Sequence, residues 1–146
     1  MSLDGVYDPN NIFAKIVRGE IPSARICEDA NTLAFMDAFP QVPGHCLVVH
    51  KSSMARNLLD VEPQALNEVM ATVQKVARAV RKALKPDGIT ITQFNGAPAG
   101  QTIFHLHFHI LPRREGVQLR AHTGEMAPND VLQRHAEAIR AALAST

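Results

Sequence analysis

Three histidines occupy alternate positions in a short apolar segment, the run HLHFHIL from His105 to Leu111. Side chains on a β-strand alternate between the two faces of the sheet, so His105, His107 and His109 would line one face at steps of roughly 6.7 Å. The intervening apolar side chains would then enter the core. Three imidazoles are costly to bury for packing alone. The run therefore predicts a strand with a chemically reactive face.

The length and charge of the chain limit its class. Its 146 residues are enough for one domain with a buried core and too few for two ordinary domains. The 15 Lys and Arg balance 14 Asp and Glu, and no block of about five or more like charges appears. This balance argues against a nucleic-acid partner and against a membrane-surface helix.

Two further features bear on the location of the protein. The sequence contains no basic-then-apolar leader and no stretch of about 18 apolar residues. Cys27 and Cys46 lie in β-like apolar stretches without a Cys-x-x-Cys spacing, so we expect them to be buried free thiols. We therefore expect a soluble, cytoplasmic protein with no membrane partner.

Hydrophobic spacing predicts an α+β fold. The segments with helical spacing are 10–17, 62–85 and 128–144. The strand-like segments are 24–28, 32–37, 45–49, 88–94 and 105–111. Short links between strands imply antiparallel pairing. We expect a five-stranded antiparallel sheet, arranged as a meander, with one long helix, a short N-terminal helix and a C-terminal helix.

A glycine-bearing loop from Asn95 to Thr102 leads into the histidine run. Gly96 and Gly100 permit backbone geometries that turn amide N–H groups inward as an anion-binding nest, and Gln101 adds a neutral donor. A hairpin turn would contain the same glycines, so the loop gains its meaning from the three imidazoles beside it. We expect this loop to accommodate a phosphate group.

Two chemistries suit the histidine face. Histidines two residues apart on a strand can bind Zn²⁺ together with a third ligand from elsewhere, leaving a water to be activated. Alternatively, a neutral imidazole attacks phosphorus and forms a covalent phosphoramidate, while neighbouring imidazoles and loop amides stabilise the developing charge. The residues alone leave both chemistries open.

The wider sequence pattern resembles the Hint branch of the histidine triad (HIT) family, whose signature is His-x-His-x-His followed by apolar residues. The matching segments are 12–22, 33–37, 43–49 and 100–113. This resemblance implies one HIT-like domain over residues 1–146, with its core at about 10–113 and a C-terminal extension over 114–146. It also implies a homodimer, formed through the long helix and a sheet edge, that needs no cofactor.

The resemblance assigns catalytic roles to four histidines. His107 falls on the family's nucleophile. His105 and His109 match the flanking histidines that orient it and contact phosphate or leaving group. His45 matches a fourth histidine associated with this cluster.

The resemblance also assigns a nucleotide-binding surface. Asp37 matches the acidic residue that accepts hydrogen bonds from ribose hydroxyls, and Thr102 stands where the family has a hydroxyl near the phosphate. The side chains that match the apolar sandwich around the base are Phe13, Ile16, Ile21 and Phe35. Ordinary core packing would explain these four equally well. The loop residues that complete the expected nucleotide site are Asn95, Gly100 and Gln101.

The sequence departs from the family in two places. Many bacterial relatives carry a structural zinc site built from Cys-x-x-Cys and a later histidine, and the matching positions here are Asn11, Ala14 and Ser53. These residues offer no thiolate and no imidazole, so we expect no metal site. His122 and His135 lie outside the family pattern, and we expect both on the surface.

The expected activity is cleavage at the α-phosphate of a nucleoside phosphoramidate or dinucleoside polyphosphate. His107 would attack phosphorus, and water would then hydrolyse the nucleotidyl-histidine to release a nucleoside monophosphate. The partner would be a purine nucleotide or a nucleoside phosphoramidate. Two alternatives stay open: a nucleotide-binding regulatory or scaffold protein with little turnover, and a zinc-dependent hydrolase that uses the three strand histidines.

Overall fold

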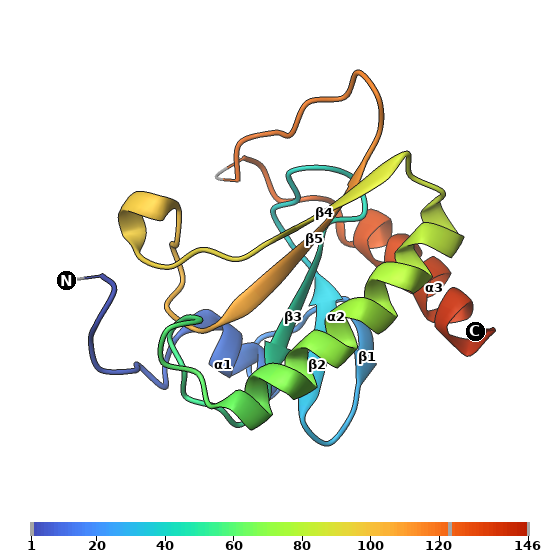
Figure 1. Ribbon diagram of the computed structural model, residues 1–146. Coiled ribbons are helices and arrows are strands. Elements are labelled where there is room, and N and C mark those ends of the chain that lie inside the picture. Colours follow the sequence, from blue (N-terminus) through green and yellow to red (C-terminus); the bar gives the residue numbers. More distant parts are fainter. Residues whose placement is uncertain (1, 123, 146) are drawn as a thin grey trace.

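The computed structural model describes residues 2–122 and 124–145, which form an open sheet covered by helices (Figure 1). In chain order the elements are α1 (Ile12–Val17), β1 (Arg25–Glu28), β2 (Thr32–Met36), β3 (Cys46–His50), α2 (Pro63–Leu84), β4 (Gly88–Thr92), the short 3₁₀ helix η1 (Ala97–Ala99), β5 (His107–Arg113) and α3 (Asn129–Ala144). The predicted α+β class is confirmed, and each predicted helix and strand lies within two residues of its expected bounds.

The five strands have the order β1-β2-β3-β5-β4, and all neighbours are antiparallel. The expected meander holds for the first three strands only. Helix α2 crosses over the sheet, so β4 runs in the same direction as β3, as strands joined by a crossover helix do. The space between these two strands is filled by β5, which pairs antiparallel to both.

The two faces of the sheet pack against different layers. Helices α2 and α3 cover one face, where Leu106, Phe108 and Ile110 enter the main core as predicted (Figure 1). A smaller apolar cluster on the opposite face joins α1 to the strands, and its buried members are Phe13, Ile16, Leu33, Phe35, Leu47 and Val49. Alternation along β5 therefore places its histidines on the α1 side of the sheet.

Local sequence explains the ends of α2. Pro63 occupies the first turn, where its missing N–H would have no partner in any case. Lys85 ends the helix in the left-handed conformation, with φ of 49°. The face turned to the sheet carries Val69, Val73 and Val76 at steps of three and four residues, all fully or nearly buried. The predicted long helix is confirmed.

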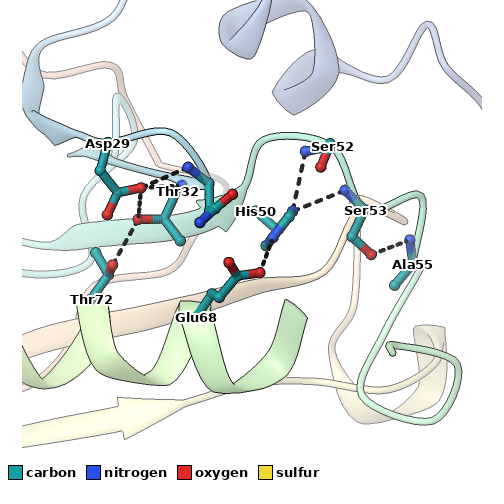
Figure 2. Close-up of polar contacts among 9 residues, drawn as sticks. Asp29, Thr32, His50, Ser52, Ser53, Ala55, Glu68 and Thr72 are labelled. Carbon is teal, nitrogen blue, oxygen red and sulfur yellow. Dashed lines mark hydrogen bonds and ion pairs between the residues drawn. The ribbon is translucent and has the colours of Figure 1, made fainter. Parts of the chain in front are cut away.

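A polar contact fixes the end of β3 to α2 (Figure 2). Nδ1 of His50 accepts hydrogen bonds from the amides of Ser52 and Ser53, at 3.1 and 2.9 Å. The proton of a neutral His50 is therefore on Nε2, which lies 3.0 Å from Oε1 of Glu68 on α2. This arrangement orients the backbone that leads from β3 into the following loop.

A second polar contact joins β2 to α2 (Figure 2). The hydroxyls of Thr32 and Thr72 lie 2.7 Å apart in a buried contact. Oδ1 of Asp29 accepts hydrogen bonds from the amides of Asn31 and Thr32, at 2.8 and 2.7 Å, which closes the turn between β1 and β2. The sheet and the long helix are thus linked by polar as well as apolar contacts.

The structure bears on two features from which we predicted the location of the protein, its membrane-spanning potential and its cysteines. No helix within residues 2–122 and 124–145 has the length and apolar character needed to span a bilayer. Both cysteines are free, as predicted, but only Cys46 is fully buried while Cys27 is half-buried. Burial raises the pKa of the Cys46 thiol, so this side chain behaves as a small neutral group.

Candidate functional site

The histidine run is only partly a strand. β5 begins at His107, so His105 lies in the bend that precedes it. The strand starts later than expected because the amide of Leu106 donates to the carbonyl of Ala55, in the loop after β3, instead of joining the sheet. His105 is nevertheless buried, and its ring lies 6.1 Å from that of Phe13.

The ring of His107 is held in one tautomer. Its Nδ1 lies 2.6 Å from the carbonyl oxygen of His105. A carbonyl oxygen can only accept, so Nδ1 carries the proton and Nε2 retains its lone pair. Burial lowers the pKa of His107, which keeps the ring neutral. A neutral imidazole with a free lone pair on Nε2 is the form that attacks an electrophile.

His109 is fixed in the opposite tautomer through His45. The amide of Gln41 donates to Nδ1 of His45 at 3.1 Å, so Nε2 of His45 carries the proton. That Nε2 lies 2.9 Å from Nδ1 of His109, which must accept and therefore carries its own proton on Nε2. Burial lowers the pKa of His45 to about 4 and that of His109 to about 3, so both are neutral near physiological pH.

The two tautomers are complementary. The rings of His107 and His109 lie 4.9 Å apart between centroids, in an edge-to-face arrangement. His107 offers a lone pair and His109 offers an N–H, the pair of groups that a displacement at phosphorus needs for nucleophile and proton donor. The arrangement therefore offers a lone pair and an N–H donor side by side without requiring either imidazole to be charged.

His105 is positioned by a residue that sequence reasoning missed. The hydroxyl of Tyr7 lies 2.9 Å from Nδ1 of His105. Burial lowers the pKa of His105 to about 4, although a hydrogen bond to the backbone of His50 opposes that effect. Tyr7 precedes α1 and belongs to no periodic segment, so no sequence signal connects it with His105, 98 residues away.

Asp37 is a buried carboxylate at the end of β2. It is 5% exposed, and its Oδ1 accepts a hydrogen bond from the amide of Phe39 at 2.8 Å. Its Oδ2 lies 2.8 Å from Nε2 of His122 and 3.5 Å from Nε2 of His45. Burial by itself would raise the pKa of Asp37, but the hydrogen bond from His122, the electrostatic effect of the nearby His45 ring and the hydrogen bond from the Phe39 amide together lower it. Asp37 is therefore ionised.

The surface position expected for His122 is wrong. Its side chain is 32% exposed and its ring lies 5.6 Å from that of His109, within the histidine cluster. The sequence could not indicate this position, because the contact joins residues 85 positions apart through a segment without periodicity. His135 is half-buried beside a separate cavity of about 230 Å³.

An apolar cavity of about 630 Å³ opens beside Asp37. All four side chains expected around a base line it, namely Phe13, Ile16, Ile21 and Phe35. The start of α3 and the chain before it contribute lining residues that the sequence did not predict: Met126, Asn129, Leu132 and Gln133. The volume falls in the usual range for small-molecule sites.

The loop expected to form an anion nest uses its amides within the protein. The amide of Gly96 donates to Oε1 of Gln101, and the amide of Gln101 donates to the carbonyl of Gly96. The amide of Gly100 donates to the carbonyl of Ala97. The glycines have positive φ values of 89° and 109°, as a tight loop requires. An open nest over residues 96–101 is therefore a wrong expectation, because these amides close η1.

The other residues of this loop have two roles: some make hydrogen bonds to neighbouring loops, and others line a cavity. The buried side chain of Gln101 donates to the carbonyl of Arg56 at 2.7 Å, and Oδ1 of Asn95 accepts from the amide of Leu58 at 2.9 Å. Gly100 and Thr102 instead line a second cavity of about 450 Å³. His122 lines both this cavity and the larger one, so it stands where they meet.

Asp37, His45, His109 and His122 each offer one ligand atom, and these atoms all lie within 4.8 Å of one another. The hydrogen bonds do not favour a metal ion there. Because the Gln41 amide occupies Nδ1 of His45, Nε2 presents a proton rather than a lone pair, whereas a metal-bound histidine donates from its second nitrogen. The zinc alternative based on His105, His107 and His109 meets its obstacle at His109, because Nδ1 of His109 accepts from His45 and its Nε2 carries the proton.

The positions that match the family's structural zinc site have other tasks here. Oδ1 of Asn11 caps α1 by accepting from the amide of Ala14 at 2.9 Å. Ser53 donates its amide to His50, and its hydroxyl lies 3.3 Å from the amide of Ala55 (Figure 2). These three positions supply no thiolate or imidazole ligand.

The fold and the buried imidazoles define an antiparallel α+β domain with a histidine-based site. The sequence profile of the HIT domain matches residues 18–116, and the chain therefore belongs to the HIT family. This confirms the resemblance noted from the motifs.

Three known proteins illustrate the similarity. The crystal structure of a Hit-like protein involved in cell-cycle regulation from Bartonella henselae has a TM-score of 0.86 and 52% identity, covering 93% of this chain and 98% of that one. A Zn-bound histidine triad family protein from Mycobacterium smegmatis has a TM-score of 0.81 and 36% identity, covering 93% and 94%. Adenosine 5'-monophosphoramidase HNT1 of Saccharomyces cerevisiae is 36% identical over 115 residues, which are 79% of this chain and 70% of that protein.

Proposed function

We propose that the protein binds a purine nucleotide and cleaves nucleoside phosphoramidates or dinucleoside polyphosphates at the α-phosphate, through a nucleotidyl-His107 intermediate. The observation that carries this proposal is the 2.6 Å contact between Nδ1 of His107 and the carbonyl of His105, which leaves Nε2 unprotonated. The yeast relative that is named as an adenosine 5'-monophosphoramidase supports the substrate class.

The reaction follows from the two tautomers. Nε2 of His107 forms a bond to the α-phosphorus while the bond to the leaving nitrogen or oxygen breaks. The leaving group takes the proton on Nε2 of His109, 4.9 Å away between ring centroids. Water then attacks the same phosphorus and gives a proton back to Nε2 of His109, the P–N bond to His107 breaks, and a nucleoside monophosphate leaves. Each step uses only groups of the chain and water.

The two cavities suit the two parts of the substrate. The base would occupy the 630 Å³ cavity, against side chains that include Phe13 and Phe35, and the ribose hydroxyls would reach Asp37 at its edge. The leaving group would extend into the 450 Å³ cavity, where Thr102 offers a hydroxyl. A buried carboxylate is a strong acceptor for hydroxyl donors, which favours ribose over deoxyribose.

Turnover distinguishes this proposal from a nucleotide-binding scaffold. Purified protein is incubated with adenosine 5'-phosphoramidate and with diadenosine polyphosphates, and the release of adenosine monophosphate is followed. Rapid-quench mass spectrometry should find a nucleoside monophosphate adduct on the peptide that contains His107. Tight nucleotide binding without turnover on any of these substrates would favour the scaffold instead.

We also propose that the chain acts as a single domain and as a homodimer. Leu132 and Ile139 of α3 pack into the main core, so residues 114–146 would belong to the same folding unit as residues 10–113. β4 lies at one edge of the sheet, and Ile91 on this strand and Met70 on α2 are 41% and 39% exposed. Such an edge commonly pairs with another chain. Light scattering should give twice the chain mass, and Ile91→Lys should give monomers.

A location in the cytoplasm would agree with the two free thiols.

A further inference from the structure

The carboxylate that would bind ribose already has a partner. Oδ2 of Asp37 lies 2.8 Å from Nε2 of His122, and Oδ1 accepts from the amide of Phe39. A pair of ribose hydroxyls needs acceptor positions on this same carboxylate. The Phe39 contact belongs to the local turn, so the position that a ligand can take over is the one held by His122.

The chain that carries His122 is attached to the segment that follows Asp37. On one side of His122, the amide of Arg120 donates to the carbonyl of Gln41 at 2.7 Å, and the Gln41 side chain donates back to Arg120 at 3.2 Å. On the other side, the amide of Ala127 donates to the carbonyl of Ala38 at 2.9 Å. These contacts hold Arg120 and Ala127, on either side of His122, whether or not His122 touches Asp37. The imidazole can therefore move without releasing the segment.

His122 also has space to move into. Its side chain is 32% exposed, in contrast to the buried His45 and His109, and it borders both the 630 Å³ and the 450 Å³ cavities. A ligand that enters the larger cavity meets this imidazole at the point where Asp37 becomes accessible. Asp37 itself is too buried to turn toward a ligand elsewhere.

We propose that His122 occupies the ribose position on Asp37 in the free protein and that a ribonucleotide must displace it to bind. This inference rests on the proposed function, because it takes Asp37 as the ribose-binding group. His122 is then a residue of the nucleotide site that makes affinity depend on pH. Displacing His122 costs the free energy of its contact with Asp37. Only a ligand with hydroxyls that bond to Asp37 compensates for this lost contact.

The direction of the pH effect follows from the groups around His122. The hydrogen bond to Asp37 raises the pKa of His122 above its ordinary value, and burial opposes this only in part. The imidazoles that face it, those of His45, His107 and His109, have pKa values lowered by burial and stay neutral in the same range. A nucleotide that separates His122 from Asp37 returns the pKa toward about 6.5 and so releases a proton. Affinity should therefore increase as the pH rises from about 6.5 toward the raised pKa, and then level off.

Calorimetric titration with adenosine monophosphate tests this inference. Because His122 is partly exposed, its contact with Asp37 is worth at most about 1 kcal/mol, so His122→Ala should bind the nucleotide about two- to fivefold more tightly near neutral pH. Titration in buffers of different ionisation enthalpy should detect proton release by the wild type and a smaller release by His122→Ala. His135→Ala, which changes a half-buried histidine at the separate 230 Å³ cavity, should match the wild type in both respects.

A ligand control separates competition from a change in the fold. Dideoxyadenosine monophosphate lacks both ribose hydroxyls, so it should bind the wild type and His122→Ala with equal affinity. Equal or weaker binding of adenosine monophosphate by His122→Ala, or an unchanged proton release, would overturn the inference while the proposed function stands. Failure of every variant to bind adenosine monophosphate would overturn the proposed function, and this inference with it.

Discussion

Nδ1 of His107 donates a hydrogen bond to the main-chain carbonyl of His105, 2.6 Å away and two residues earlier in the chain. This contact exists because His105 lies outside β5 and its carbonyl is not used in the sheet. A backbone acceptor cannot change its protonation, so the tautomer of His107 is fixed by the fold. The nitrogen that we propose as the nucleophile is thus defined by where the strand begins.

Replacing His107 by Asn should abolish turnover and preserve binding. Asn keeps a polar group at the position but has no nitrogen lone pair that can attack phosphorus, so turnover should fall by about 10³-fold or more. Single-turnover kinetics with adenosine phosphoramidate and calorimetry with adenosine monophosphate measure the two effects. His135→Asn is the matched control and should leave both unchanged. An adduct on another residue, or full activity of His107→Asn, would refute the mechanism.

Asp37→Ala should weaken the binding of ribonucleotides while the fold survives. The variant removes the acceptor for the ribose hydroxyls, a loss of about tenfold or more in affinity for a charge-assisted hydrogen bond. Asp37→Asn should keep the turn, because its amide oxygen still accepts from Phe39, and should also bind more weakly, because its NH2 group cannot accept from ribose hydroxyls. Titration with adenosine monophosphate, after circular dichroism has verified the fold, gives the answer. Unchanged affinity would remove Asp37 from the site.

His45→Phe should lower kcat with little change in KM. Without the proton on Nε2 of His45, 2.9 Å away, Nδ1 of His109 is free to take the proton, and Nε2 no longer donates to the leaving group. His45→Gln should restore part of the rate, because the Gln amide can donate to the same nitrogen. Nitrogen-15 NMR of the His109 ring reports the tautomer directly. A tautomer that is identical in the wild type and His45→Phe would contradict this role.

Chelation should leave the rate unchanged. The Gln41 amide directs a protonated nitrogen of His45 toward the cluster, so the set of ligand atoms is held together by hydrogen bonds rather than by a cation. Protein dialysed against a chelator should retain full turnover, and metal analysis should find substoichiometric metal. Stoichiometric zinc, together with activity lost to the chelator and restored by metal, would support the zinc-dependent hydrolase.

Acidification should destabilise the fold before the carboxylates titrate. In the folded state the pKa of His45 and that of His105 are lowered by burial to about 4, whereas an unfolded histidine has a pKa of about 6.5. Protons therefore bind preferentially to the unfolded chain, so these residues stabilise the fold fully above about pH 6.5 and lose that contribution as the pH falls toward 4. Urea unfolding at several pH values measures the slope. His45→Gln should reduce it, and an equal slope would exclude His45 as a source.

Much of the fold could be predicted because it depends on local periodicity. The steps of three and four residues in α2 and the alternation of His107, Phe108 and His109 each reflect one geometry of the backbone. The order of the last two strands was not accessible in this way. It depends on α2 carrying the chain past the position that β5 later fills, and no local pattern records that crossing.

The sequence by itself determined the helices and strands and the imidazoles of one face, because residue type and spacing fix these features, and the resemblance to the HIT family added four of the side chains that line the larger cavity. Only the tertiary structure decided which nitrogens carry protons and that His122 contacts Asp37. The tautomers depend on a backbone amide at Gln41 and a carbonyl at His105, groups that every residue has and that sequence cannot distinguish. The His122 contact arises when a segment without periodicity folds back across 85 positions of the chain.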